Sequence, residues 1–188
     1  WQTLGGKVVD QIALSQNSAE TTRQMSRFLH FQAPHERRTD FDVIFLASGP
    51  PIGRQVKPLL KFFYAGDIPV FATAAIYSGM PQSQRLDSDL NQIIFCAAPW
   101  SLAKSNIEPL LYAQLKTASP EYFGRDSKYY ALGIDAFHIT QQLARLNQSP
   151  QQKLVGATGL LSLNSQRRIV RQLPCAQFRH RNIVLIDP

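Results

Sequence analysis

The chain has 188 residues, of which 44% are hydrophobic and 18% charged, so it can bury a core and is not globally disordered. No run of eighteen apolar residues occurs, which excludes a membrane-spanning helix within this sequence. Two cysteines are too few for a disulfide-built scaffold or a four-cysteine metal site, and a net charge of +7 permits an anionic partner without requiring one. Because the first residue is Trp1, we expect a fragment or a processed product, and the lack of a signal peptide says nothing about its compartment.

The first half of the sequence alternates predicted strands with predicted helices. The pattern predicts strands over 7–14, 42–47, 68–75 and 92–97 and helices over 19–31 and 53–64, with a polar loop over 78–89. Asn17 or Ser18 would cap the first helix. Pro58 predicts that the second helix begins near Lys57 or is kinked. This order favours an α/β fold with a mainly parallel sheet that is flanked by helices.

The second half is richer in helix. Helices are predicted over 106–117 and 128–146, a hairpin over 156–169 and a final short strand over 182–186. The longer helix carries one apolar stripe through Leu132, Ala136, Ile139, Leu143 and Leu146, which Tyr130, Ile134 and Phe137 widen. We therefore expect this helix to be buried on more than one side.

The segment 97–102 follows the fourth predicted strand and precedes the helical region. We interpret it as a crossover between two lobes. Pro99 restricts Ala98 to extended geometry, and Trp100 is expected to anchor the crossover by being buried.

The turn Ser48–Gly53 joins a predicted strand to a predicted helix. In open α/β sheets, ligands lie outside the carboxyl ends of strands, so Ser48, Gly49 and Gly53 are candidates for the lip of a small-molecule cleft. An ordinary strand-to-helix turn is the alternative, because the spacing is neither a P-loop nor a dinucleotide-binding motif.

No catalytic or metal-binding motif stands out. The four histidines, His30, His35, His138 and His180, do not have the spacing of metal ligands, and no nucleophile elbow is present, so we assign no catalytic residue, cofactor or metal. Cys96 and Cys175 are interpreted as buried, inert thiols, with a disulfide between them as an alternative.

The positive charge is concentrated in residues 151–188. Arg167, Arg168 and Arg171 are the candidates for a basic face on which an acidic protein partner docks. A solvated hairpin is the simpler alternative. Nucleic-acid binding is weakly supported, because Phe178 is the only aromatic residue in this region.

Several stretches in order resemble a known family. They are 1–6, 42–47 with 52–58, 69–73, 98–100, 130–136 and, most specific, Gly156–Leu163 leading into Arg167–Arg171. Over nearly the whole chain this order resembles the type I periplasmic-binding-protein fold and, more closely, the C-terminal part of the LppC family. The implied organisation is a sheet region of the second lobe (1–97), a crossover and helical region of the other lobe (98–155), and a hairpin and final strand that return to the sheet (156–188).

The resemblance also implies a function. Members of this family are non-enzymatic activators of penicillin-binding proteins, anchored as lipoproteins at the periplasmic side of the outer membrane. They stimulate the transpeptidase activity of a bifunctional peptidoglycan synthase. A lobe of a periplasmic solute-binding receptor is the alternative, and an unrecognised enzyme or nucleic-acid binder is a weaker one. Because the stripe on the helix 128–146 would need a cover, we also expect the chain to self-associate or to retain a partner segment.

Overall fold

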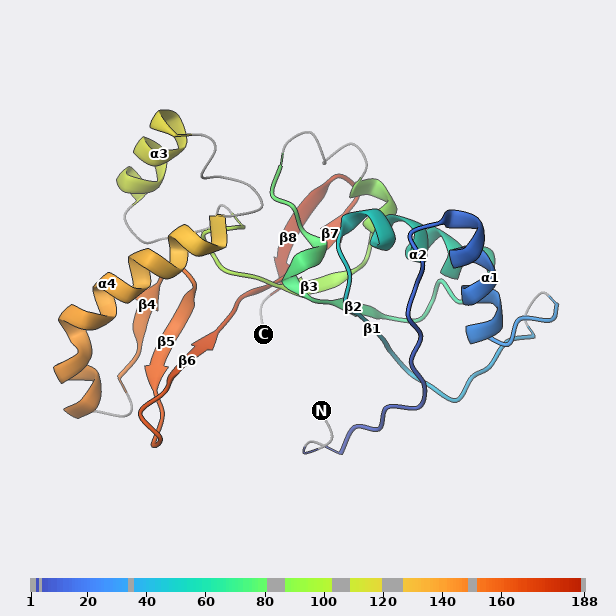
Figure 1. Cartoon of the computed structure of the whole chain (residues 1–188), viewed down its shortest axis with the longest axis horizontal. Helices are drawn as coiled ribbons and strands as arrows, with labels where there is room; N and C mark the ends of the chain where they lie inside the picture. The colour runs from blue at the N-terminus through green and yellow to red at the C-terminus, as the bar shows by residue number, and fades with distance from the viewer. Residues whose placement is uncertain are drawn as a thin grey trace. The chain divides into compact units, whose positions relative to one another are not determined.

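The computed structural model describes residues 3, 5–33, 36–80, 87–102, 109–119, 127–148 and 152–186. The chain forms two compact units (Figure 1). Unit 1 comprises Trp1–Tyr77, Arg85–Ile94 and Gln177–Ile183, and unit 2 comprises Ser78–Gln84, Phe95–Ala176 and Val184–Pro188. Within the described residues, no helix combines the length and hydrophobicity that a bilayer crossing requires.

A five-stranded sheet runs in the order β1-β2-β3-β7-β8. Its strands are β1 (Ile44–Leu46), β2 (Val70–Ala72), β3 (Ile94–Cys96), β7 (Cys175–Arg179) and β8 (Asn182–Ile186). β1 and β2 are parallel, with Phe45 opposite Phe71, as the strand–helix–strand order predicts. Three of the four strands predicted in the first half are confirmed with shorter bounds, whereas β7 was not predicted.

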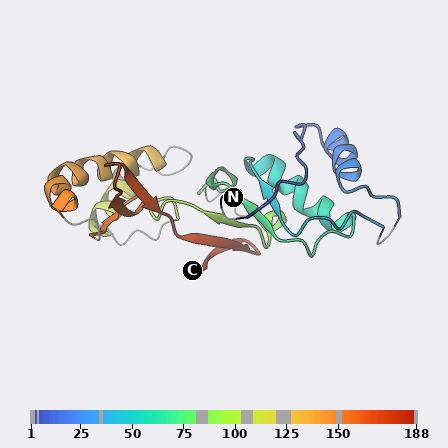
Figure 2. The ribbon, with the colours of Figure 1, turned by 90° about the horizontal axis from the view of Figure 1, so that it is seen from below.

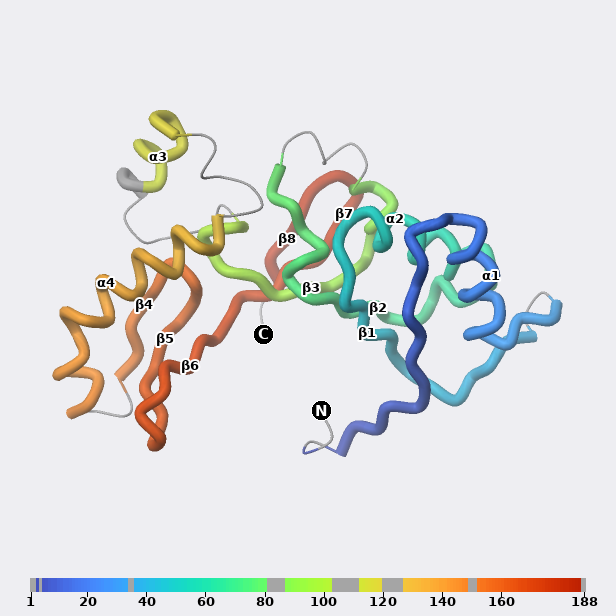
Figure 3. The backbone as a smooth tube through the Cα atoms, viewed as in Figure 1, coloured from blue at the N-terminus to red at the C-terminus, as the bar shows by residue number. Residues whose placement is uncertain are grey.

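Two helices of unit 1 accompany this sheet. α1 (Ser18–Phe28) begins after Asn17, whose side chain accepts hydrogen bonds from the backbone N–H groups of Ala19 and Glu20, so the predicted cap is confirmed. α2 (Pro50–Phe62) connects β1 to β2, as the backbone trace in Figure 3 shows. Two short 3₁₀ turns lie between β2 and β3 in the sequence: η2 (Ala74–Ile76) comes after β2, and η4 (Asp87–Leu90) comes before β3.

The expected start of α2 near Lys57 is wrong. The helix begins at Pro50, and Pro58 lies inside it. Proline suits the first turn, where backbone N–H groups have no partner within the helix. Val56, Leu60 and Phe63 form a buried stripe on this helix, and that burial offsets the hydrogen bond that Pro58 cannot donate.

The expected strand over 7–14 is also wrong. This segment is extended but belongs to no strand, and Val8, Val9 and Ile12 are exposed. These apolar side chains therefore lie on the surface and not in the core. Instead, Asp10 of this segment forms an ion pair with Arg38 at 2.7 Å.

Unit 2 contains α3 (Pro109–Ala118), α4 (Ser127–Gln148) and a separate antiparallel sheet of β4 (Leu154–Gly156), β5 (Gly159–Leu163) and β6 (Ile169–Gln172). α4 packs along β4 and β5 (Figure 2). The predicted hairpin is confirmed as β5–β6 and is extended by a third strand, β4. Residues 106–108 of the first predicted helix lie outside the described residues.

Trp100 is buried, as predicted, and belongs to the core of unit 2. It is 2% exposed and packs with Ala131 and Ala157. Its ring centroid lies 4.8 Å from that of Tyr112, and burial raises the pKa of the Tyr112 hydroxyl. The backbone N–H of Trp100 donates to the carbonyl of Ala157 at 3.1 Å, which ties the segment after β3 to the sheet of unit 2.

The expectation that α4 is buried on more than one side is wrong. Ala131, Asp135 and Leu146 are buried, whereas Phe137 is 63% and Leu143 47% exposed. The sheet of β4, β5 and β6 covers one side of α4. The apolar residues of α4 also occupy part of the opposite side, where this sheet does not cover them.

Candidate functional site

A buried polar cluster joins α4 to the turn between β4 and β5. The carboxylate of Asp135 is fully buried and accepts hydrogen bonds from the backbone N–H of Ala157 at 2.6 Å and that of Thr158 at 2.8 Å. It also accepts one from the Thr158 hydroxyl. A Cβ on Gly156 would lie 2.7 and 2.8 Å from the two Asp135 oxygens, so glycine is what lets the carboxylate approach this backbone.

Sequence reasoning did not identify Asp135 as a structural centre. The available signal was an acidic residue within the apolar stretch Tyr130–Ala136, near the helix face that packs on the core. A buried carboxylate needs several donors, and those donors come from a turn more than twenty residues away, which no local pattern reveals.

The structure places the three candidate basic residues on one hairpin, in two different settings. Arg167 and Arg168 are exposed in the turn between β5 and β6, where Asn164 accepts the backbone N–H of Arg168. Arg171 lies on β6 opposite Leu161, and its Nε donates to the Thr158 hydroxyl at 3.0 Å. Arg171 therefore extends the Asp135 cluster, and Arg167 and Arg168 are the freer pair.

The surface of unit 2 carries charge of one sign within its described residues. Their single acidic residue, Asp135, is fully buried. The exposed charged residues of this part of the chain are all basic: Lys116, Lys128, Arg145, Lys153, Arg167, Arg168 and Arg171. The described part of the surface of unit 2 is thus suited to an acidic partner.

The candidate cleft lip lies at the beginning of α2. Gly49 caps the helix, and Ser48 Oγ is buried with no hydrogen-bond partner among the described residues. Gly53 faces the core, because a Cβ there would overlap Ile76 Cδ1 and lie 2.9 Å from Leu90 Cδ2. Since proline carries no N–H, Pro50 and Pro51 leave few donors for an anion at this helix end. The role of Ser48, Gly49 and Gly53 as a lip stays a prediction.

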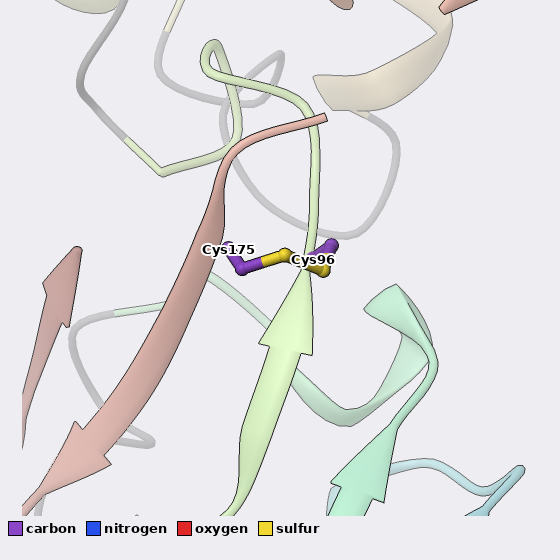
Figure 4. The surroundings of a disulfide bond; sticks show 2 residues. All are labelled: Cys96 and Cys175. Atoms are coloured by element: carbon purple, nitrogen blue, oxygen red, sulfur yellow. A yellow bond between two sulfur atoms is a disulfide. The ribbon is translucent and has the colours of Figure 1, made fainter. Parts of the chain in front are cut away.

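The two cysteines are not free thiols, contrary to our interpretation. Cys96, at the end of β3, and Cys175, at the beginning of β7, form a disulfide (Figure 4). The residues are 79 positions apart in the sequence, so only the pairing of β3 with β7 brings them together. The alternative that the sequence left open is the correct one.

The described histidines, His30, His138 and His180, do not form a metal site. Among the residues that the structure describes, no group of three His, Cys, Asp or Glu side chains is placed to hold a metal ion. His35 lies outside the described residues.

Comparison with known proteins places the chain in a family. Residues 5–181 match the family model described as "LppC putative lipoprotein". The penicillin-binding protein activator LpoA of Vibrio vulnificus is 24% identical over 143 residues, which is 74% of this chain and 22% of that protein. LpoA of Yersinia pseudotuberculosis is 28% identical over 148 residues, which is 77% of this chain and 22% of that protein. The chain thus spans less than a quarter of the length of these relatives.

Solved structures support the fold. The C-domain of LpoA (YraM) from Haemophilus influenzae, described as a regulator of PBP1A, matches all of this chain and 54% of its own with a TM-score of 0.73 and 19% identity. A "putative branched-chain amino acid ABC transporter" from Chromobacterium violaceum matches 95% of this chain and 52% of its own, with a TM-score of 0.64 and 28% identity. The predicted α/β fold of the type I periplasmic-binding-protein kind is confirmed.

Proposed function

The chain belongs to the LppC family, and from this membership we propose that it is part of a non-enzymatic regulator of peptidoglycan synthesis. The observation that carries the proposal is the family match over residues 5–181, together with relatives that are named activators of penicillin-binding proteins. In this proposal the chain binds a bifunctional penicillin-binding protein and stimulates its transpeptidase activity. It performs no chemistry itself.

The proposed contact is the basic surface of unit 2. Arg167 and Arg168 are exposed in a turn and are the first candidates for contact with an acidic face of the synthase. Opposite charges on two partners speed their encounter and favour the correct pairing. Arg171 is better suited to support the turn through Thr158.

The proposed location is the periplasmic side of the outer membrane, in a lipid-anchored parent protein. The family description as a lipoprotein supports this location. The Cys96–Cys175 disulfide also fits an oxidising compartment.

A binding and cross-linking assay tests the proposal. The purified chain is mixed with the bifunctional penicillin-binding protein of its own organism, and both affinity and peptide cross-linking are measured. We expect binding, increased cross-linking, and a roughly tenfold weaker affinity for Arg167→Glu/Arg168→Glu because two favourable charges are reversed. Arg23→Glu/Arg27→Glu on α1 makes the same charge change in unit 1 and serves as the control.

Three outcomes would overturn parts of the proposal. Absence of both binding and stimulation removes the regulator function. Equal losses for the two double variants remove the assigned contact and leave the function. Peptidoglycan synthesis or hydrolysis by the chain alone, abolished by one substitution, removes the non-enzymatic assignment.

A second candidate function is the binding of a small solute. It is favoured by the likeness to the Chromobacterium violaceum protein and by the buried, unpartnered Ser48 Oγ, which a ligand hydroxyl or carboxylate could engage. Thermal unfolding with and without branched-chain amino acids tests it. A rise in Tm that Ser48→Ala abolishes would support this function, and no rise at millimolar ligand would remove it.

A further inference from the structure

The boundary between the two units falls inside two neighbouring strands. In β3, Ile94 belongs to unit 1 and Phe95 to unit 2, and in β7, Ala176 belongs to unit 2 and Gln177 to unit 1. β3 and β7 are adjacent in the five-stranded sheet. The chain therefore leaves unit 1 along one strand and returns to it along the strand beside it.

The backbone hydrogen bonds set the register of this strand pair. The N–H of Phe178 donates to the carbonyl of Ile93 at 3.0 Å, and the N–H of Ala97 donates to the carbonyl of Pro174 at 3.2 Å. As the residue number rises along β3, it falls along β7, so the two strands are antiparallel. In this register Cys96 lies directly opposite Cys175, as the view of the two neighbouring strands in Figure 4 illustrates.

The hydrogen-bond ladder weakens next to the disulfide. Pro174 has no N–H, so it accepts a bond from Ala97 and cannot return one. The disulfide is one residue from this incomplete pair, on the side toward the boundary between the units. The covalent link thus lies next to a pair of the ladder that can form only one of its two backbone hydrogen bonds.

The disulfide also closes most of unit 2 into a covalent loop. The 79-residue separation of the two cysteines includes α3, α4 and the whole β4–β5–β6 sheet. The chain also passes between the units at Tyr77–Ser78, Gln84–Arg85 and Ile183–Val184, but the two crossings in β3 and β7 are the ones beside which a disulfide joins the strands.

We propose that the Cys96–Cys175 disulfide is a clamp on this strand pair: it keeps β3 and β7 paired where both strands cross the boundary, so that these two segments move as one ribbon and not as two independent strands. A dithiol that reduces the clamp gives up two electrons and two protons, becomes a disulfide itself and leaves two thiols on the protein. Only backbone hydrogen bonds then hold β3 to β7 beside Pro174. The proposal does not depend on the identity of any partner.

Hydrogen exchange followed by mass spectrometry tests the clamp on the full chain. Protein prepared under oxidising conditions is compared with the same protein after dithiothreitol treatment and with Cys96→Ser/Cys175→Ser. We expect amides in peptides covering 92–97 and 176–178 to exchange roughly tenfold faster without the disulfide, because local opening of the strand pair becomes easier. Peptides from α2 and β5 serve as internal controls, and their rates should change less than about twofold.

The chemically reduced protein keeps the test valid if the double variant does not fold. Two free thiols in protein from an oxidising preparation would overturn the proposal. Unchanged exchange in β3 and β7 after verified reduction would do so as well. A uniform rise across both units, or one spread over all of unit 2, would also overturn it, since the bond would then be a general stabiliser.

Discussion

Substitution of Asp135 is expected to destabilise unit 2, because its carboxylate is fully buried. Its two oxygens accept three hydrogen bonds, two of them from the backbone N–H groups of buried residues. Asp135→Asn turns one of those oxygens into an N–H donor that faces other donors. We expect the free energy of unfolding to fall by roughly 1–3 kcal/mol, because a buried donor loses its acceptor.

Chemical denaturation measures this loss. Trp100 fluorescence reports on unit 2, in a Trp1→Phe background that removes the other tryptophan. Asp67→Asn is the matched control, because the Asp67 side chain is 73% exposed in its ion pair with Arg37. An exposed ion pair of this kind contributes only about 0–1 kcal/mol to the free energy of unfolding. A loss for Asp135→Asn no larger than that of the control would contradict the structural role assigned to Asp135.

Asp40 makes the stability of unit 1 depend on pH. Hydrogen bonds from the Arg38 guanidinium, at 2.7 Å to each carboxylate oxygen, lower the pKa of Asp40 from 3.8 to about 2. The same guanidinium lowers the pKa of Asp10. A depressed carboxyl pKa contributes stability that is present above 3.8 and is lost as the pH falls through about 2.

Replacing Arg38 should reduce the loss of stability that occurs as the pH falls. In Arg38→Gln we expect the free energy of unfolding to change less steeply between pH 3.8 and about 2 than in the unmodified chain. The slope is the readout, because the Arg38 guanidinium also lies over the rings of Phe28 and Phe41, 5.6 Å from each centroid, and its loss lowers stability at every pH. Arg27→Gln on exposed α1 surface is the control, and equal slopes in all three proteins would contradict the prediction.

Single residues differ in how far their roles could be predicted. The burial of Trp100 and the cap at Asn17 follow from residue type and local sequence. The Cys96–Cys175 bond and the donors to Asp135 depend on which strands pair and in which register, and that information is not local. The candidate roles of Arg167 and Arg168 rest on charge alone and stay predictions.

At the scale of elements, the way α2 packs on its neighbours depends on one glycine. A Cβ at position 53 would overlap Ile76 and press on Leu90, so Gly53→Ala should force the helix away from the two 3₁₀ turns. Alanine gains about 1 kcal/mol in helix propensity over glycine. Overpacking costs roughly 1–3 kcal/mol, so the net change should be destabilising.

Gly133 in α4 provides the matched control, because nothing lies within 4 Å of a Cβ built there. Gly133→Ala should raise the free energy of unfolding by up to about 1 kcal/mol. Thermal unfolding, monitored by circular dichroism, compares the stability of both variants with that of the unmodified chain. A stabilising effect of Gly53→Ala would show that α2 and its neighbours can adjust.

The elements themselves were largely predictable where burial follows a clear period. The stripe of Val56, Leu60 and Phe63 predicts α2, and the continuous apolar run before Ser48 predicts β1. The extended segment 7–14 has the apolar and β-branched residues that are typical of a strand, yet it pairs with no strand among the described residues. β7 was missed because it follows Pro174 and alternates apolar and polar residues for only five positions.

At the scale of the whole molecule, the two units differ in how their charges are compensated. The ion pairs among the described residues, such as Arg38–Asp40 and Arg54–Asp87, all lie in unit 1. The described surface of unit 2 carries basic residues with no exposed acid beside them. The described charges of unit 1 are partly compensated by one another, whereas the described basic surface of unit 2 would gain from an acidic partner.

Unit 2 also exposes an apolar face on α4 that its own sheet does not cover. Tyr129, Leu132, Phe137 and Leu143 are between 39% and 63% exposed on this helix, and its charged residues are Lys128, the buried Asp135 and Arg145. Burying each of these large side chains is worth roughly 1.5–3 kcal/mol. A face of this size on a protein in water drives association.

We therefore expect the purified chain to self-associate through α4 or to retain a bound partner segment. Light scattering at micromolar concentrations should give a mass above that of one 188-residue chain. Phe137→Glu/Leu143→Glu should reduce that mass to a single chain, because a glutamate on this face is too costly to bury. Gln141→Glu adds one negative charge at another exposed position of α4 and should leave the mass unchanged. A single-chain mass for the unmodified protein at every concentration would instead show that this face is tolerated in water.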